Sequence, residues 1–435
     1  MNHTATLSRI AIAFLVAAAL TSVASAQPPV PPPSNPAAPQ AGRGAARPTV
    51  VSPEILPDAR VVFRIYAPGA ESVTLNASDI PAPAALQAAP PAQPPAAVSA
   101  TPAAPQPPRG PVFTKGDNGV WEATAGPIVP GAFRYVFVVD GVRTLDPVNT
   151  SVSESNTANW SMFYVPGLDV QDVKDVPHGA VASVYYYSTV LKTTRRMHVY
   201  TPPGYESGQA KYPILYLLHG SGDTDDAWTS VGRAGFIIDN LIVAGQVRPC
   251  VIVMPAGHQP APLPGDIAAR PAASPATSPE VNAFTREFVA DIAPYIERHY
   301  RLLPGRRNAA IAGLSMGGSQ TLDIAFRDLD RFAYIGVFSS GASLGGGRGA
   351  GSAGTPPPDW ETVHQANLDD ASLKKDTRLI WLSTGVDDRL IVSTKTTVDL
   401  LLKHGFKPVF KQSAGAHTWL NWRDYLRDFA MQIFK

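Results

Sequence analysis

The chain has 435 residues, of which 45% are hydrophobic and 16% charged, which is enough apolar material for a large core and for more than one domain. Its 36 lysines and arginines nearly balance its 35 aspartates and glutamates, so the formal net charge is +1. This balance excludes a general electrostatic attraction to nucleic acid or to an anionic membrane, and we expect neither as a partner. The single cysteine, Cys250, excludes an intrachain disulfide.

The N-terminus has the pattern of a cleaved signal peptide, residues 1–26. Arg9 supplies a positive charge, residues 10–20 are apolar, and a small-residue site ends at Ala26. The apolar run is short for a membrane anchor, and no later stretch is apolar enough to span. We therefore expect cleavage after Ala26 and a mature protein in the periplasm or outside the cell.

Four segments are rich in Pro and Ala, or in Gly and then Pro, and lack side chains that can be buried. Residues 27–49 are expected to be a linker that follows the signal peptide. The other three interrupt regions of regular pattern, so we expect them to be insertions at loop tips: 81–111, 259–280 and 341–358.

Residues 50–165 have a β pattern. Residues 61, 63 and 65 are Val, Phe and Ile and alternate with Val62, Arg64 and Tyr66, and residues 133–139 repeat this period of two. A hairpin signal, Asp140-Gly141, follows the second run directly. The pattern predicts a small all-β, immunoglobulin-like sandwich of antiparallel strands.

The segments VVFRIYAPGAESVTL, GVWEATAGPIVPGAFRYVFVVDG and DPVN in this region resemble the early-set domains of starch- and glycogen-acting enzymes, the family-48 carbohydrate-binding type. The resemblance covers about 100 residues and implies possible glycan contact or support of a neighbouring domain. Trp121 is the aromatic side chain that would stack on a sugar, but its position favours the domain core.

Residues 175–435 alternate between strands and helices, which predicts an α/β fold with a mostly parallel sheet and helices on both faces. One helix is expected to begin with Ser278 as N-cap and Pro279 at its first position, and another to span 393–404 and end at Gly405. Cys250 opens a strand and is expected in the core. The expected strands are 182–188, 196–203, 212–220, 250–258, 308–315, 334–341, 379–385 and 408–417.

The pattern G-x-S-x-G occurs at Gly313-Leu314-Ser315-Met316-Gly317. It follows a predicted strand and opens a predicted helix, as a nucleophile elbow does, and the glycines allow close approach of strand and helix. A serine nucleophile needs a histidine base, and the base needs a carboxylate. In the α/β-hydrolase fold the carboxylate comes after the serine in the sequence, and the histidine comes after the carboxylate. Asp387 and Asp388 compete for the acid role, and His417 comes after the next strand.

The same geometry predicts two backbone donors for an oxyanion. One is the N–H of Met316, and the other lies in the segment HGSGD, near Ser221. His219 is expected to order this loop, and His258 to line the pocket. The nearby aspartates, Asp223, Asp225 and Asp226, lack the spacing of a calcium loop and are expected to form a solvated loop. We expect no metal and no cofactor.

The segments YPILYLLHGSGDTDDAW, IAGLSMGGSQTLDIAFRDLDRFAYIGVFSSG, STGVDDRLI and GAHTWLNWRDYL resemble the esterase D family, and within it the feruloyl and acetyl-xylan esterases of carbohydrate esterase family 1, often labelled enterochelin-esterase-like. The resemblance implies Ser315 as nucleophile, Asp388 as acid and His417 as base. It places the oxyanion donors on the backbone of Ser221 and Met316, and Trp228 and Trp419 near the pocket.

The resulting hypothesis is an exported serine carboxylesterase that removes feruloyl or acetyl groups from plant polysaccharide through an acyl-enzyme. A small-molecule ester is an alternative substrate. The alternative functions are a siderophore esterase, a sugar acyltransferase, or a non-enzymatic glycan-binding protein. Because every predicted catalytic element follows residue 175, we expect residues 175–435 alone to hydrolyse a small activated ester.

Overall fold

The computed structural model describes residues 47–77, 79–80, 110–258, 282–342 and 359–435. Within it, Pro48–Lys435 belong to one compact unit. The expected signal peptide, most of the linker and nearly all of the three Pro- or Gly-rich insertions lie outside the described residues, so those expectations stay predictions. Among the described residues, no helix is both long enough and apolar enough to cross a membrane.

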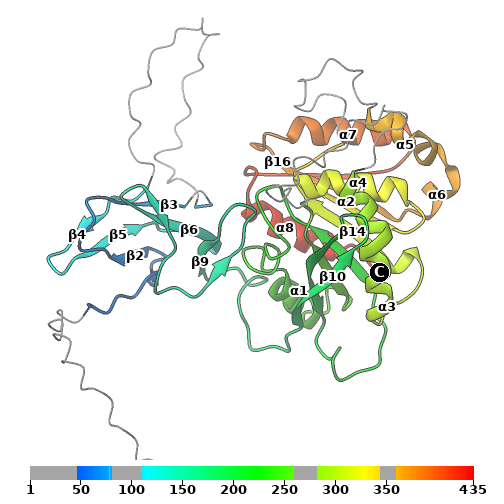
Figure 1. The fold of residues 1–435 in the computed structure, drawn as a ribbon. Helices are drawn as coiled ribbons and strands as arrows, with labels where there is room; N and C mark the ends of the chain where they lie inside the picture. The colour runs from blue at the N-terminus through cyan, green and yellow to red at the C-terminus, as the bar shows by residue number, and fades with distance from the viewer. Residues whose placement is uncertain (1–46, 78, 81–109, 259–281, 343–358) are drawn as a thin grey trace, which may run out of the picture. The chain divides into compact units, whose positions relative to one another are not determined.

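Residues 54–165, here called the β-region, form two antiparallel sheets (Figure 1). One sheet has the order β1-β2-β5-β4, and the other has β3-β6-β9-β8 with β7 paired to β6. The strands are β1 (Glu54–Ile55), β2 (Val61–Tyr66), β3 (Val73–Asn76), β4 (Thr114–Lys115), β5 (Val120–Ala125), β6 (Gly131–Val139), β7 (Val142–Thr144), β8 (Val152–Ser153) and β9 (Trp160–Val165).

The alternating residues of β2 build the core between these two sheets. Val61, Phe63 and Ile65 are at most 4% exposed. The Phe63 ring lies edge-on to Tyr135 of β6 at 4.9 Å and to Phe163 of β9 at 5.6 Å, measured between ring centroids. Aromatic pairs in this geometry add to the stabilisation from burial alone. The period of two in the sequence therefore identified the buried face of this strand.

Two further predictions for the β-region are confirmed. Asp140 and Gly141 have positive φ angles of 47° and 81° and join β6 to β7, as a tight hairpin requires. Trp121 is buried, and its indole N–H donates to the Ala67 carbonyl at 3.0 Å. Its ring is therefore part of the core and is not a platform for stacking on a sugar.

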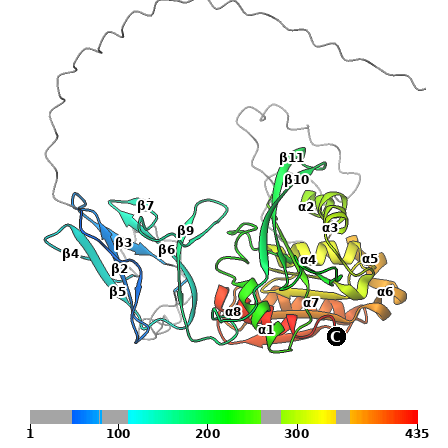
Figure 2. The ribbon, with the colours of Figure 1, turned by 90° about the horizontal axis from the view of Figure 1, so that it is seen from below.

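The remaining strands form an eight-stranded sheet in the order β10-β11-β13-β12-β14-β15-β16-β17. β10 and β11 pair antiparallel, as do β11 and β13, and every later pair is parallel, as predicted. Figure 2 shows β10 and β11 as a long pair at one end of this sheet. The strands are β10 (Ala180–Ser188), β11 (Thr193–Thr201), β12 (Ile214–Leu218), β13 (Val251–Pro255), β14 (Ala309–Leu314), β15 (Tyr334–Phe338), β16 (Leu379–Gly385) and β17 (Val409–Ser413).

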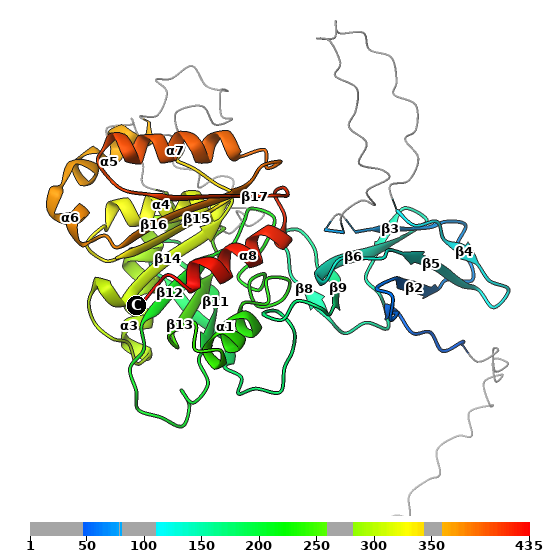
Figure 3. The same ribbon diagram turned by 180° about the vertical axis from the view of Figure 1, so that it is seen from behind.

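Helices cover both faces of this sheet. α1 and α8 pack on one face, and α2 to α5 with α7 pack on the other (Figures 1 and 3). Strands covered on both faces read as continuous apolar runs, and β12, β13 and β15 are buried throughout. The helices are α1 (Ala234–Val243), α2 (Ala283–Glu287), the π-helix η3 (Phe288–Ile292), α3 (Ala293–His299), the 3-10 helix η4 (Arg306–Asn308), α4 (Met316–Arg327), α5 (Trp360–Asp369), α6 (Ala371–Asp376), α7 (Ile391–Lys403) and α8 (Trp419–Ala430).

Two helix boundaries differ from the prediction. Ser278 and Pro279 lie outside the described residues, and α2 begins at Ala283 with Asn282 as its N-cap, whose side chain accepts from the Phe284 N–H at 2.9 Å. Helix α7 begins two residues before the predicted start, and Gly405 follows its end with a φ of +78°, as predicted.

Candidate active site

Ser315 occupies a strained turn between β14 and α4. Its φ of 52° and ψ of −116° are unusual for a residue with a side chain, as expected of a nucleophile elbow. The Ser315 N–H donates to the Phe338 carbonyl at 2.9 Å, and the Ser340 hydroxyl donates to the Ser315 carbonyl at 2.6 Å. These bonds hold the turn from the next strand, and Ser315, at the end of β14, lines a cavity.

The two flanking glycines are required by close backbone contacts. A Cβ on Gly313 would lie 2.3 Å from the Gly317 carbonyl oxygen. A Cβ on Gly317 would lie 2.5 Å from the carbonyl oxygen of His219, directly after β12. Neither distance is tolerated by real side chains, so the turn packs against both its own helix and the neighbouring strand. This is the close approach that the G-x-S-x-G pattern predicts.

The structure brings Ser315, His417 and Asp388 into one hydrogen-bonded chain. His417 Nε2 lies 3.0 Å from Ser315 Oγ, and His417 Nδ1 lies 3.0 Å from each carboxylate oxygen of Asp388. The three side chains follow β14, β16 and β17, whose parallel carboxyl ends lie at one edge of the sheet. The arrangement has the geometry of a nucleophile, a base and an orienting acid.

Of the two competing aspartates, only Asp388 reaches the histidine. Asp388 is 2% exposed, whereas Asp387 is exposed on the surface. Burial alone would raise the pKa of the Asp388 carboxyl, but hydrogen bonds from His417 and the Leu390 N–H outweigh burial and lower this pKa. Asp388 is therefore ionised near neutral pH and can hold His417 with Nδ1 protonated, which leaves Nε2 to accept a proton from Ser315.

The expected oxyanion donors flank Ser315. Met316 is the first residue of α4, and Ser221 belongs to the segment Gly220–Asp226, here called the oxyanion loop. Outside helices and strands, no backbone hydrogen bond of the described residues uses the N–H of either residue. A Cβ on Gly220 would lie 3.5 Å from the Ser315 Cβ, so the loop packs against the elbow. Both N–H groups are thus available beside the nucleophile.

His219 orders this loop, as predicted. Its Nδ1 donates to the Gly220 carbonyl at 2.8 Å, and its Nε2 accepts from the Gly257 N–H at 2.8 Å. Burial lowers the pKa of His219 to about 4, so the imidazole is neutral and its tautomer is set by these two bonds. His219 therefore has a supporting role and takes no part in the hydrogen-bonded chain of Ser315.

A cavity of about 460 Å³ opens above Ser315 and His417. Trp419 lines it, as expected from the resemblance. Its lining also includes side chains that the sequence did not predict. Arg134 on β6 and Trp160 on β9 come from the β-region, and the exposed Arg389 follows Asp388 directly. The full lining is Asp79, Arg134, Ser155, Thr157, Trp160, Gly220, Ser221, Gly222, Asp223, Leu314, Ser315, Arg389, His417, Thr418, Trp419 and Trp422.

Two expected substrate contacts lie elsewhere. Trp228 is fully buried, its indole N–H donates to the Leu218 carbonyl at 3.1 Å, and its ring packs edge-on against Trp419 with 5.0 Å between centroids. Trp228 therefore packs against Trp419 from within the core and stabilises its position. His258 lines a separate cavity of about 350 Å³ together with Met316 and Gln320. The structure does not bring Trp228 or His258 to the cavity above Ser315.

A larger cavity, of about 650 Å³, lies at the opposite edge of the sheet, where β12 and β14 begin with Ile214 and Ala309. Its lining is rich in charged side chains and contains no member of the chain formed by Ser315, His417 and Asp388. In α/β sheets ligands bind beyond the carboxyl ends of the strands, so the smaller cavity is the candidate active site. The described side chains form no cluster of three or more groups placed to hold a metal ion.

Comparison with known protein families gives one match over more than half of the chain. The family described as Esterase matches residues 188–432, which include all three side chains of the hydrogen-bonded chain. A curated relative, an endo-1,4-beta-xylanase/feruloyl esterase from Xylanibacter ruminicola, is 31% identical over 75% of the chain. The chain spans only 42% of the length of that relative.

Solved structures with a similar fold are also esterases. A ferulic acid esterase has 25% sequence identity and a TM-score of 0.50, covering 59% of this chain and 99% of its own. The enterobactin esterase of Shigella flexneri has 15% identity and a TM-score of 0.54, covering 86% of this chain and 92% of its own. At 15% identity, the match to the enterobactin esterase shows a similar fold only. It covers a larger share of the chain than the family match to residues 188–432.

Proposed function

The chain belongs to the Esterase family, and we propose that it is a carboxylic ester hydrolase that cleaves its substrate through an acyl-enzyme formed on Ser315. The observation that carries this proposal is the chain of 3.0 Å contacts from Ser315 Oγ to His417 and from His417 to Asp388. His417 takes the hydroxyl proton as Ser315 attacks the ester carbonyl, and then returns that proton to the leaving alcohol. Water, activated by the same histidine, releases the acid.

The negative charge that forms on the carbonyl oxygen is stabilised by the backbone N–H groups of Ser221 and Met316. Met316 is the first residue of α4, so the helix N-terminus adds a favourable dipole. Removing one donor of this kind from an acyl-transfer enzyme costs about 3 kcal/mol in the transition state. The oxyanion loop therefore has to be held rigidly in place for the reaction to be fast.

We propose feruloyl or acetyl esters of plant polysaccharide as substrates. The support is the name of the Xylanibacter relative, a xylanase/feruloyl esterase, and the similarity to a solved ferulic acid esterase. The cavity is large enough for an aromatic acyl group, and three tryptophans line it: Trp160, Trp419 and Trp422.

The electrostatics of the cavity favour a neutral ester over an anionic iron chelate. Arg134 and Arg389 line the cavity together with Asp79 and Asp223, so their formal charges cancel. Three hydrogen bonds join Arg134 to these aspartates, two to Asp79 and one to Asp223. A ferric siderophore would gain little from such a lining, although the fold of an enterobactin esterase is similar over most of the chain. Transfer of the acyl group to a sugar remains the alternative outcome of the second step.

We further propose that the protein is exported after cleavage behind Ala26, and that the β-region is an early-set type of domain. The support is the signal-peptide pattern and the sequence resemblance of residues 61–75 and 119–141. Because Trp121 is buried, any glycan contact of the β-region has to use other side chains. Mass spectrometry of the protein isolated from the periplasm or the medium tests the cleavage, because the molecular mass of a mature chain should correspond to a start at Gln27.

A substrate panel tests the function. The purified full chain, with Ser315→Ala as the control, should be compared by kcat/KM on methyl ferulate, acetylated xylan and a ferric siderophore. Release of ferulate or acetate at least about 100-fold more efficiently than siderophore hydrolysis supports the proposal. A preference for the siderophore contradicts it, and a product in which the acyl group has moved to sugar identifies a transferase.

A further inference from the structure

The oxyanion loop is held by backbone contacts with the β-region. Ser155, between β8 and β9, forms an antiparallel bridge with Asp223. The Asn156 N–H donates to the Gly222 carbonyl at 3.2 Å, so two consecutive residues pair with the loop directly after Ser221. The Glu154 N–H donates to the Asp226 carboxylate at 3.0 Å. Residues 154–156 therefore run beside the loop like a short added strand.

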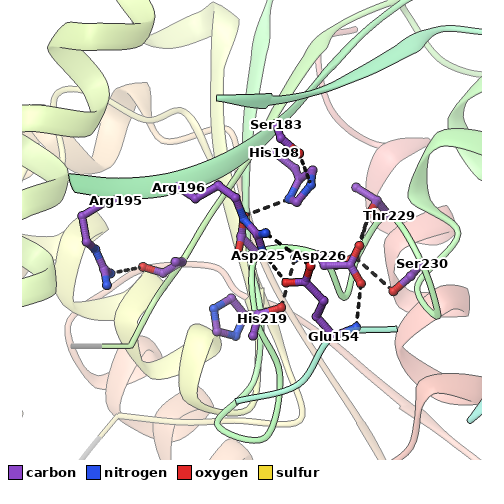
Figure 4. A network of polar contacts seen from close by, with 12 residues as sticks. Glu154, Ser183, Arg195, Arg196, His198, His219, Asp225, Asp226, Thr229 and Ser230 are labelled. Atoms are coloured by element: carbon purple, nitrogen blue, oxygen red, sulfur yellow. Dashed lines mark hydrogen bonds and ion pairs between the residues drawn. The ribbon is translucent and has the colours of Figure 1, made fainter. Parts of the chain in front are cut away.

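A side-chain network fixes the far half of the loop (Figure 4). Glu154 forms an ion pair with Arg196 of β11, and Arg196 Nε and Nη2 donate to the two oxygens of Asp225 at 2.8 and 2.9 Å. Although burial alone would raise the pKa of Asp225, hydrogen bonds from His198 and Arg196 outweigh it and lower this pKa to about 2. Asp223 and Asp225, which were expected in a solvated loop, are therefore buried, because Arg134 and Arg196 reach them from distant parts of the sequence. Asp226 is half-buried and accepts from the Glu154 N–H.

Arg134 of β6 makes the contact nearest to the chemistry. Its Nη1 donates to Asp223 Oδ1 at 2.6 Å, and its Nε donates to Asp79 Oδ2 at 2.7 Å. The Arg134 side chain is 14% exposed and that of Asp223 is 6% exposed. Burial raises the pKa of Asp223, and the attraction of Arg134 opposes that rise. The pair is therefore a desolvated salt bridge, whose loss leaves one charge buried without a partner.

The position of Asp223 makes that charge important for catalysis. Asp223 lies two residues after Ser221 and lines the same cavity as Ser315. A negative charge develops at the carbonyl oxygen during attack, and an uncompensated, buried carboxylate that lines the same cavity would oppose it. Arg134 supplies the opposite charge and also fixes the loop through Asp223.

We propose that Arg134 is a positioning residue for ester cleavage: by pairing with Asp223 it neutralises a carboxylate beside the oxyanion and, with residues 154–156, holds the oxyanion loop. The β-region then contributes to the reaction through Arg134 and residues 154–156, and supplies more than a wall of the cavity. This inference rests on the proposed function, since it assigns Arg134 a role in the reaction at Ser315.

The test is a double-mutant cycle in the full chain, with p-nitrophenyl acetate as a small neutral substrate. Arg134→Gln should lower kcat about 10- to 100-fold and change KM by less than about threefold, because the loss is in the transition state. The same change made in an Asp223→Asn background should cost at least about tenfold less, because the carboxylate of the oxyanion loop that Arg134 neutralises has already been removed. The matched control is Arg64→Gln, which removes an arginine that pairs with Glu54 and Glu122 in the other sheet.

Three results would overturn the inference: an Arg134→Gln enzyme as active as Arg64→Gln, a loss confined to KM, or a loss of the same size in the Asp223→Asn background. If the Arg134→Gln protein does not fold, the double variant Arg134→Gln/Asp223→Asn is compared with Asp223→Asn instead. A kcat that is 100-fold lower in the double variant would contradict the proposed role of the Asp223 charge. A wild-type chain that hydrolyses no ester refutes the proposed function instead, so the two failures are distinguishable.

Discussion

At the scale of single residues, the choice between Asp387 and Asp388 can be tested directly. Asp388→Asn should lower kcat about 10³- to 10⁴-fold, because the amide favours the wrong tautomer of His417 and cannot stabilise its protonated form. Asp387→Asn is the matched control and should cost less than about threefold, since its side chain is exposed. Steady-state kinetics on p-nitrophenyl acetate measure both. A larger loss in the Asp387 variant would show that the acid is misassigned.

The proposed nucleophile and base were predictable from sequence because each has a local signal, whereas the choice of Asp388 over Asp387 came from the family resemblance. Ser315 sits in a motif with a required backbone shape, and His417 follows the last strand in the order that the fold imposes. Arg134 has no such signal. Its partner Asp223 is 89 residues away, and nothing in the segment around Arg134 indicates which loop it reaches. Contacts of this kind depend on the tertiary arrangement, so sequence pattern alone leaves them out.

At the scale of elements, the junction of β14 and α4 depends on Gly317. Gly317→Ala would place a Cβ 2.5 Å from the His219 carbonyl oxygen, so the backbone has to shift and we expect a loss of about 1–3 kcal/mol in unfolding free energy. Activity should fall as well, because the Met316 N–H moves with the turn. Gly235→Ala in α1, where the nearest atom is 3.7 Å away, is the control and should cost nothing. Urea unfolding measures both, and equal stabilities would contradict the packing argument.

His219 makes stability depend on pH. Its pKa is about 4 in the folded chain and ordinarily 6.5, so between these values only the unfolded chain binds the proton. The unfolding free energy should therefore fall as the pH is lowered, by about 2 kcal/mol from pH 7 to pH 5 through this residue alone. His219→Gln should remove that part of the pH dependence. Urea unfolding at the two pH values tests this, and an unchanged difference between them would rule out His219 as its source.

Element types were easier to predict than element ends. The strands of the large sheet read as long apolar runs, which leave few alternatives for segments buried on both faces. The start of α2 was harder, because Ser278 and Asn282 are both good N-cap residues. Local propensity does not rank two such signals four residues apart, and in the described residues Asn282 makes the capping bond.

At the scale of the whole molecule, the structure changes the expectation for a fragment that begins at residue 175. Such a fragment keeps Ser315, Asp388 and His417 but loses Arg134 and residues 154–156, which hold the oxyanion loop. We now expect it to lose at least about tenfold in kcat on p-nitrophenyl acetate and to be less stable, because the buried Asp223 loses its partner. Circular dichroism and gel filtration should precede the assay. A folded, monomeric fragment with the kcat of the full chain would restore the original expectation.

The control for the fragment is a nicked full chain. A protease site introduced at Asp175 and then cut leaves every contact between the β-region and the oxyanion loop in place. The nicked protein should elute as one species and keep the kcat of the uncut chain. If nicking alone abolishes activity, the loss in the fragment reports chain continuity and not the missing contacts.

A covalent probe tests directly whether Ser315 is the nucleophile of an acyl-enzyme. A fluorophosphonate reacts with a serine only where a base and an oxyanion site activate it, so it reports the whole arrangement in one step. The full chain should take up one equivalent, peptide mapping should place it on Ser315, and His417→Ala should not be labelled. Labelling of a different serine, or equal labelling of the His417→Ala variant, would show that Ser315 is not a nucleophile activated by His417.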